Sequence, residues 1–411
     1  MPFPTGLRAL NHRDFRRFWT GQLISLVGTW MQSVGQSWLV LELTNSPFKL
    51  GLISALQFGP MLCFSFVAGV IADRVPKRRL IIATQTALML QAFGLSALAW
   101  TGHVQYWHVA ALASLYGVAT TLDMPTRQSF IVEMVGKDDL MNAIALNSAM
   151  FNGARVVGPA AAGLLIARYG VAIAFLLNGL SFLAVILALL GIHNEGLPQA
   201  RGETSVFEDV AAGIRYATGT PLVSLVLSLL LFVSLFAINH SVLVPILARD
   251  ILHEGAQGFG LLMASLGTGA VAGALALAML GSGRPRLVVL VAGAAVVSAG
   301  TLSLAAVRHF WPAAVGLALI GFSQIVFLAS SNSTLQMAVP DRLRGRIMGL
   351  YGFVLVGVTP IGSLFVGSIA EVFGVSVAFA AGGGMGLVLV LALTAWWMRG
   401  TAGRSPGRLW S

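Results

Sequence analysis

Residues 69–79 read Gly69-Val70-Ile71-Ala72-Asp73-Arg74-Val75-Pro76-Lys77-Arg78-Arg79, a charged loop at the end of an apolar run. Gly51-Leu52-Ile53-Ser54-Ala55 opens that run, and Gly260-Leu261-Leu262-Met263-Ala264 opens a similar run 209 residues later, which ends in Pro285-Arg286. An internal repeat of this kind indicates two related halves in one chain. Ser282 and Gly283 stand where the first copy has Asp73 and Arg74, so only the first half keeps the full charged loop.

The composition predicts a membrane protein. Hydrophobic residues make up 57% of the chain and charged residues 10%, whereas soluble chains carry roughly a quarter charged residues. A membrane-spanning helix needs about 20 mostly apolar residues. Twelve such spans lie near residues 18–41, 48–72, 80–100, 105–125, 141–166, 171–191, 221–247, 256–280, 287–306, 311–333, 346–370 and 374–398. The predicted fold is therefore an all-α membrane protein with twelve transmembrane helices.

The longest stretch without an apolar span covers residues 193–220, at the midpoint of the chain. It predicts a linker between an N-terminal half, residues 1–192, and a C-terminal half, residues 221–411, that ends in a short tail. One helical face within the linker is apolar and is formed by Phe207, Val210, Ala211, Ile214 and Ala217. A helix lying on the membrane surface and a plain solvated connector are both open for this segment.

The distribution of charge predicts which side each loop occupies, because Lys and Arg in short loops stay cytoplasmic. With twelve spans, 20 of the 25 Lys and Arg fall in the termini and the even-numbered loops, and the exceptions are Lys49, Arg155, Arg168, Arg249 and Arg308. Both termini are therefore predicted to be cytoplasmic. The topology also accounts for the net charge of +10, so we predict no nucleic-acid partner. The N-terminal segment lacks the cleavage site of a signal peptide and is predicted to be retained.

Four stretches carry a resemblance to a known family. The loop with Gly69, Asp73, Arg74 and Lys77 to Arg79 is similar to the loop between the second and third helices of the major facilitator superfamily. Three later stretches resemble the branch with macrolide efflux pumps and enterobactin exporters: Asp123-Met124-Pro125-Thr126-Arg127-Gln128, residues 152–163 with Arg155, Gly158, Pro159 and Gly163, and Val244-Pro245-Ile246-Leu247-Ala248-Arg249-Asp250. The resemblance implies two pseudo-symmetric six-helix bundles, a substrate site near mid-membrane and alternating access.

The charged loop is a candidate gate. A carboxylate at the inner end of a helix can pair with basic residues when that side is closed and release them when it opens. We predict this gating role for Asp73, Arg74, Lys77 and Arg78, and for Asp123 and Arg127 near the inner end of span four. The alternative is that the basic residues only set the topology, which is the interpretation we favour for Arg79.

Span five is the first candidate wall of a substrate cavity. Arg155 lies about 14 residues into the span, or about 21 Å at 1.5 Å per residue, which is mid-membrane depth. An arginine there is costly unless it faces a cavity and has a partner. Asn147, Phe151, Arg155 and Gly158 share one helical face. A structural arginine satisfied by a neighbouring helix is the alternative.

Gly158, Pro159 and Gly163 resemble the glycine and proline pattern of antiporters, which implies a helix bend and a tight helix contact. The double glycine of the fullest versions is missing here. A simple packing kink at Pro159 is the alternative.

Polar residues in other spans extend the predicted cavity. Ser25, Thr29, Gln32 and Gln36 recur at helical spacing in span one, and such a stripe points to water or substrate rather than lipid. The candidates in the second half are Asn239, His240 and Gln324, each of which could instead make an interhelical hydrogen bond.

Proton coupling needs a group that changes its protonation state. Asp123 is the best acidic candidate, but Pro125 predicts that the helix ends there, so pairing with Arg127 or with the 2–3 loop is an alternative role. Glu42 and Glu371 lie at outer ends, where we interpret them as solvated carboxylates. His240 lies deeper and titrates in a useful range.

No catalytic motif, metal-spaced cluster or nucleotide loop is found, and the single Cys63 excludes a disulfide within the chain. Gly267, Gly269 and Gly273 lie within an apolar span and are better explained by helix contact than by a dinucleotide fingerprint. We therefore predict a monomeric secondary transporter of the bacterial inner membrane, with no cofactor. It exports a small amphipathic or hydrophobic solute, such as a drug, siderophore or metabolite, in exchange for protons across the lipid bilayer. A polytopic membrane enzyme and a lipid translocator are the alternatives.

Overall fold

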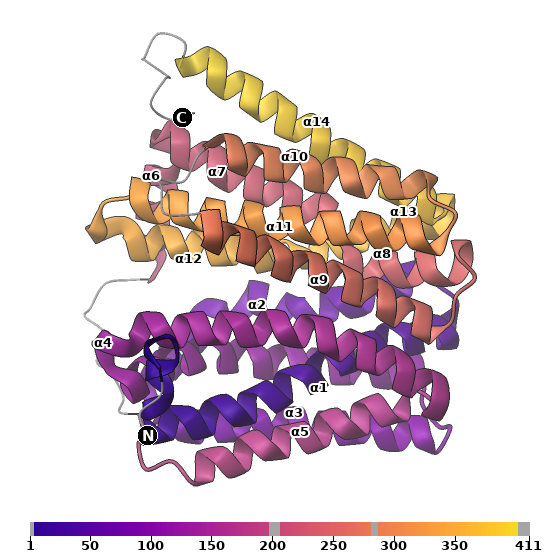
Figure 1. The fold of residues 1–411 in the computed structure, drawn as a ribbon, viewed down its shortest axis with the longest axis horizontal. Coiled ribbons are helices and arrows are strands. Elements are labelled where there is room, and N and C mark those ends of the chain that lie inside the picture. Colours follow the sequence, from indigo (N-terminus) through magenta and orange to yellow (C-terminus); the bar gives the residue numbers. More distant parts are fainter. Residues whose placement is uncertain (1–3, 197–205, 281–286, 402–411) are drawn as a thin grey trace. The chain divides into compact units, whose positions relative to one another are not determined.

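The computed structural model describes residues 4–196, 206–280 and 287–401. All regular structure in these ranges is helical, as Figure 1 shows. The second copy of the charged loop, with Ser282, Gly283, Pro285 and Arg286, lies outside the described residues. The same holds for the side chain of Phe207 in the predicted linker.

The first part of the chain forms a short 3-10 helix and five long helices. Their bounds are η1 Thr5–Asn11, α1 Arg13–Thr44, α2 Pro47–Arg74, α3 Lys77–Trp100, α4 Tyr106–Tyr169 and α5 Ala172–Leu190.

The second part contains more helices because two of its spans are interrupted. The elements are α6 Val206–Gly219, α7 Pro221–Phe232, η2 Val233–Ala237, α8 His240–Ile246, η3 Leu247–Ile251, α9 Ala256–Leu280, α10 Leu287–Ser303, η4 Leu304–Ala306, α11 Phe310–Ala338, α12 Asp341–Gly357, α13 Thr359–Phe373 and α14 Val375–Thr401. The predicted span 221–247 is broken between η2 and α8, at Ile238 and Asn239.

Ten helices in the described ranges are long and apolar enough to cross a membrane. The 32-residue α1 is not among them, because its polar side chains lower its hydropathy. The 64-residue α4 counts as one of the ten, although at 1.5 Å per residue it extends for about 96 Å, which exceeds two bilayer cores of about 30 Å. It is interrupted at Gly136, whose φ of 70° and ψ of −179° are not helical.

The prediction that a helix ends at Pro125 is wrong, because α4 continues through this residue. A proline removes one backbone donor, and a membrane helix tolerates this where hydroxyl side chains serve nearby carbonyls. The hydroxyl of Thr126 donates to the carbonyl of Leu122 at 2.7 Å, and the hydroxyl of Thr121 donates to that of Gly117 at 2.7 Å. The helix therefore ends its regular course at Gly136 and not at the proline.

The chain divides into two compact units. Unit 1 comprises Met1–Asn45, Leu56–Gly202 and Gly255–Ala264, and unit 2 comprises Ser46–Ala55, Glu203–Glu254 and Ser265–Ser411. The main division, after Gly202, falls within the predicted linker 193–220. Two short segments group with the other unit than the residues that follow them: the beginning of α2 groups with unit 2, and the beginning of α9 with unit 1. These segments contain the repeated sequences 51–55 and 260–264.

Each unit has its own apolar core. In unit 1, Phe18 and Phe130 are fully buried, and their rings meet edge to face with centroids 6.2 Å apart. In unit 2, Leu229, Val297 and Phe327 lie in one buried cluster. Other large apolar side chains are exposed, including Leu90 and Leu187 at about 60% of their surface, as expected for helices that face lipid.

Candidate functional site

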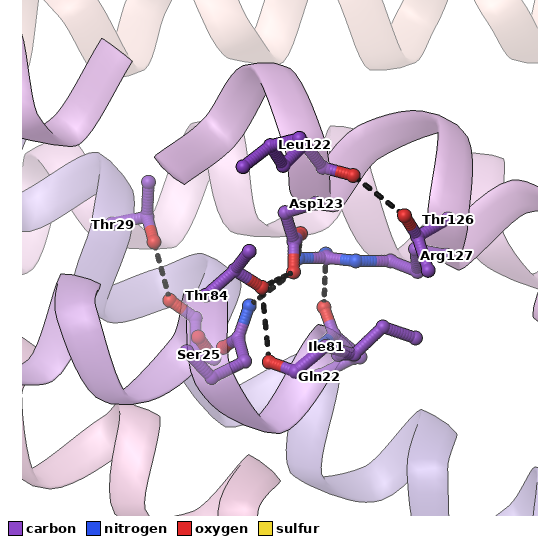
Figure 2. Close-up of polar contacts among 10 residues, drawn as sticks. Gln22, Ser25, Thr29, Ile81, Thr84, Leu122, Asp123, Thr126 and Arg127 are labelled. Atoms are coloured by element: carbon purple, nitrogen blue, oxygen red, sulfur yellow. Dashed lines mark hydrogen bonds and ion pairs between the residues drawn. The ribbon is translucent and has the colours of Figure 1, made fainter. Parts of the chain in front are cut away.

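The buried carboxylate of Asp123 is the centre of a polar cluster in unit 1. Asp123 is the only carboxylate that is buried among the described residues. It pairs with Arg127, one turn later on α4. The hydroxyl of Thr84 donates to Asp123 Oδ1 at 2.8 Å, and Nε2 of Gln85 donates to the same oxygen at 2.9 Å (Figure 2). Both donors come from the buried face of α3.

Arg127 extends the cluster to α1. Its Nη1 donates to the side-chain oxygen of Gln22, while its Nη2 contacts Asp123. The i, i+4 spacing of Asp123 and Arg127 places both side chains on one face of α4, toward α1 and α3 (Figure 2). The ion pair thus joins three helices, and the sequence analysis named both of its members.

Several polar atoms of this cluster have no hydrogen-bond partner among the described residues. These buried atoms include Gln22 Nε2, Gln85 Oε1 and Arg127 Nε. A buried polar group that lacks a partner costs about 1–3 kcal/mol.

A second buried network lies farther along α1. Nε2 of Gln32 donates to Oε1 of Gln91 on α3 at 2.9 Å, and Nδ2 of Asn178 on α5 donates to Oε1 of Gln32 at 2.7 Å. Gln36 donates to Gln57 of α2 at 3.0 Å. Two residues of the predicted stripe on span one, Gln32 and Gln36, therefore hydrogen-bond between helices.

The other two residues of that stripe have local roles. Ser25 is buried, and its backbone carbonyl accepts a hydrogen bond of 2.9 Å from the hydroxyl of Thr29 (Figure 2).

Arg155 lies among aromatic side chains. Its Cζ is 5.9 Å from the ring centroid of Trp30, a distance at which a guanidinium and an aromatic face attract one another. The Trp30 ring in turn meets Phe151 edge to face at 5.8 Å. Arg155 and Phe151, predicted to line a cavity, are thus brought together on α4, whereas Asn147 is half-buried two turns from Arg155.

Gly158 and Gly163 make close helix contacts on α4. A Cβ on Gly158 would lie 2.5 Å from Cβ of Trp30, and a Cβ on Gly163 would lie 3.0 Å from the carbonyl of Ala256. A Cβ on Gly260 of α9 would lie 2.5 Å from the carbonyl oxygen of Pro159. The tight helix contact expected for Gly158, Pro159 and Gly163 is present, and the antiporter role inferred from these residues stays a prediction.

Lys77 of the charged loop is fully buried. Its Nζ lies 2.6 Å from Oε1 of Glu133 on α4. The backbone N–H of Lys77 donates to the carbonyl of Gly196 at 3.1 Å. Glu133 is not among the residues predicted from the sequence, because a helix that ended at Pro125 would not have carried this residue toward α3.

The other basic residues of the loop have different surroundings. Arg78 donates to the carbonyls of Leu189 and Leu190, at 2.7 and 3.1 Å, and so caps the C-terminus of α5. Asp73 is half-buried and Arg74 is exposed in the last turn of α2. The gating roles of these residues stay predictions.

In unit 2, Asn239 and His240 lie at the break between η2 and α8, and both are buried. Nδ2 of Asn239 donates to the carbonyl of Leu235 at 2.8 Å. Gln324 is buried on α11. Interrupted spans with polar residues at the break are a common setting for transport sites.

These features define a polytopic membrane transporter. They combine an all-helical chain with ten candidate spans, an ion pair buried in one of them and a further span interrupted at polar residues. A family model described as transmembrane secretion effector matches residues 4–401. The chain belongs to this family of the major facilitator superfamily, and the predicted resemblance is confirmed.

Named relatives cover most of the chain. The enterobactin exporter EntS of Salmonella typhi is 28% identical over 381 residues, which are 92% of this chain and 91% of the relative. The staphyloferrin A transporter of Staphylococcus aureus is 23% identical, with 87% and 90% covered. The multidrug efflux pump Tap of Mycolicibacterium fortuitum is 25% identical, with 86% and 88% covered.

Solved structures share the fold at low sequence identity. The nucleoside transporter NupG has a TM-score of 0.70 at 13% identity, with 93% of this chain and 98% of that chain covered. A POT family transporter in complex with 5-aminolevulinic acid has a TM-score of 0.77 at 10% identity, with 94% and 96% covered. The chain is a secondary transporter of small solutes with the major facilitator fold.

Proposed function

We propose that this chain exports a small amphipathic or hydrophobic solute from the bacterial cytoplasm in exchange for protons, by alternating access. The named relatives handle enterobactin, staphyloferrin A and drugs. These names support an exporter whose solute is small and chemically variable. The protein works as a monomer in the inner membrane and needs no cofactor or metal.

The proposed topology has twelve passes with both termini in the cytoplasm. Ten candidate spans, the polar α1 and a second pass within the 64-residue α4 together make twelve. The excess of Lys and Arg in the termini and the even-numbered loops supports this orientation. Residues 1–192 and 221–411 form the two halves, joined by residues 193–220.

The observation that carries the coupling proposal is the buried carboxylate of Asp123 in its ion pair with Arg127. A transporter coupled to protons needs a site whose charge changes while it is shielded from bulk water, and Asp123 is the only buried carboxylate among the described residues. When Asp123 is ionised, its charge holds Arg127. When Asp123 takes up a proton, the charge attraction is lost, whereas the hydrogen bond of Arg127 to Gln22 on α1 does not depend on that charge.

This exchange couples protonation to helix packing. Thr84 and Gln85 donate to the same carboxylate oxygen, so the contact of α3 with α4 also depends on its charge. A proton and a solute that favour different arrangements of these helices affect each other's binding reciprocally. Asp73, Arg74, Lys77 and Arg78 form the inner gate in this proposal.

The proposed solute contacts of unit 1 lie along α1 and α4. Arg155 with Trp30 and Phe151 offers a cation beside two aromatic rings, which suits an anionic or acceptor-rich solute with a flat apolar part. Further candidates on these two helices are Ser25, Thr29, Gln32, Gln36 and Asn147. In unit 2 the candidates are Asn239 and His240 at the interrupted span and Gln324 on α11.

The test is solute uptake into inverted membrane vesicles. An imposed proton gradient should drive accumulation by the wild type, and Asp123→Asn should abolish the driven part while leaving exchange of solute against solute in place. Asp138→Asn is the matched control, because Asp138 is an exposed carboxylate on the same helix. Full gradient-driven uptake by Asp123→Asn would reject Asp123 as the coupling residue. Accumulation of phospholipid would favour the lipid translocator, and conversion of a solute without a gradient would favour an enzyme.

A further inference from the structure

The N-terminus of α2 is capped by a residue from a distant part of the sequence. Oε2 of Glu371, in the last turn of α13, accepts hydrogen bonds from the hydroxyl of Ser46 at 2.8 Å and from the backbone N–H of Phe48 at 3.0 Å. The Ser46 hydroxyl also accepts the backbone N–H of Lys49 at 3.2 Å. All these residues belong to unit 2.

Local helix physics does not explain why an acid occupies position 371. The C-terminal end of a helix carries partial negative charge, so an acidic side chain there is unfavourable, whereas the same charge is favourable at a helix N-terminus. Serine is a preferred N-cap, and a capping box adds a Glu or Gln three residues later. That position in α2 is Lys49, which cannot accept a hydrogen bond. Glu371 supplies the missing carboxylate from α13.

The rest of this contact is close and made of small residues. A Cβ on Gly51 would collide with the carbonyl of Ser363, and a Cβ on Gly367 would lie 2.9 Å from the carbonyl of Pro47. The hydroxyls of Ser54 and Ser363 are 2.9 Å apart and buried. Residues 46–54 thus run antiparallel along residues 363–371, with the carboxylate contact at one end.

Helix α2 is shared between the two units. Residues 46–55 group with unit 2 and the remainder with unit 1. During alternating access the halves of a transporter rock or gate around the substrate site, so a helix shared in this way must release one of its contacts in part of the cycle. The exposed carboxylate of Glu371 reaches water without any movement of the buried Ser363, which makes this end the easier one to release.

We propose that Glu371 is a latch that holds the first two turns of α2 against α13 and so keeps the outer end of α2 closed for part of the transport cycle. The proposal rests on the alternating-access function and on the cytoplasmic termini, which place this end of α2 on the outer side. Glu371 is a positioning residue and does not contact the solute. The sequence-based interpretation of Glu371 as a plain solvated carboxylate omitted its contact with α2.

The test measures the contact itself. Cysteines replace Ser54 and Ser363 in a Cys63→Ala background, and the rate of oxidant-driven disulfide formation is followed in native membranes. Glu371→Ala should slow disulfide formation about two- to fivefold, the range expected for one charge at a helix N-terminus. Ser46→Ala removes the hydroxyl that donates to Glu371 from the α2 side. This variant should also slow disulfide formation. Glu42→Gln is the control, because Glu42 is an exposed carboxylate that accepts a hydrogen bond from Trp38 on its own helix.

Equal rates in Glu371→Ala, Ser46→Ala and the control would overturn the latch. If Glu371→Ala fails to fold, as judged by elution from a sizing column in detergent, Glu371→Met keeps the side-chain length and removes both acceptor oxygens, and an unchanged rate in that variant is equally decisive. The readout involves no solute or proton gradient. A failure of the latch is therefore distinguishable from a failure of the proposed export function.

Discussion

Arg127 lies one helical turn after Asp123 on α4, and its guanidinium bridges that carboxylate to Gln22 of α1. The Asp123 side chain is 3% exposed, whereas that of Arg127 is 25% exposed. Removal of Arg127 therefore leaves a buried charge uncompensated, which costs about 3–5 kcal/mol. We expect Arg127→Ala to lower the free energy of unfolding by about this amount, and Asp123→Ala to lower it by less, because the guanidinium that remains reaches water. The double variant should cost clearly less than their sum, as measured by denaturant unfolding in detergent micelles.

The pair of Arg249 and Asp250 is the control for this cycle. Their side chains are 23% and 39% exposed at a separation of 2.6 Å. Removal of either residue should cost no more than about 1 kcal/mol. Strictly additive effects at Asp123 and Arg127 would contradict a direct pair.

The ion pair of Lys77 and Glu133 predicts an asymmetry between its two partners. The Lys77 side chain is 0% exposed, whereas that of Glu133 is 20% exposed. Glu133→Gln should therefore destabilise the protein more than Lys77→Met does, because it removes the Glu133 charge from beside a fully buried ammonium, whereas the carboxylate that Lys77→Met leaves behind reaches water. Thermal unfolding in detergent measures the stability of the two variants.

Arg79 and Glu195 are the comparison for that pair. They are 72% and 52% exposed and 3.7 Å apart. Arg79→Met should change stability by no more than about 1 kcal/mol. A larger loss for Lys77→Met than for Glu133→Gln would refute the proposed role of burial.

Helix contacts in unit 2 depend on single glycines. A Cβ on Gly269 of α9 would collide with the carbonyl of Ala318 on α11. Backbone atoms cannot move aside as a flexible side chain can, so Gly269→Ala should destabilise the protein by about 1–3 kcal/mol. Gly384→Ala on α14, where a Cβ would meet nothing within 4 Å, should be neutral or slightly stabilising in the same unfolding assay. Equal stability of the two variants would show that α9 and α11 can separate at no cost.

The N-terminal segment is held to α4 by a titratable contact. Hydrogen bonds from His12 and Arg8 lower the pKa of Asp139, which lies on α4 just beyond the Gly136 break, between the two proposed passes of this helix. A lowered pKa means that the contact stabilises the folded state above the ordinary aspartate range and that this stabilisation is lost as the pH falls through the lowered value. The segment should therefore stay docked at neutral pH and detach only in strong acid.

Maleimide labelling of a cysteine in place of the buried Ala9, in a Cys63→Ala background, reports on this docking. Asp139→Asn should raise the labelling rate at neutral pH. Asp138→Asn should not, because Arg8 contacts only the backbone carbonyl of Asp138. Slow labelling of Asp139→Asn would show that the segment stays docked without the Asp139 contact. The buried residues of η1 and the hydrogen bonds of Asn142 with Gly6 and Ala9 would then be sufficient to hold it.

The sequence by itself determined that this is a helical membrane transporter. Lipid offers the backbone no hydrogen-bond partners, so each pass must be a helix of about 20 apolar residues, and such runs are visible without a structure. The pairing of Asp123 with Arg127 was also open to prediction, because their i, i+4 spacing is local.

Only the tertiary structure decided which of several possible partners each polar residue has. Pro125 is a helix breaker by local rules, yet α4 continues through it and brings Glu133 to Lys77. Gln32 belongs to a polar stripe by spacing, yet it bonds to Gln91 and Asn178. Glu371 is 323 residues from Phe48, and no periodicity relates them. Hydrogen bonds and ion pairs act over about 3 Å, so their partners are set by how the helices pack and not by position along the chain.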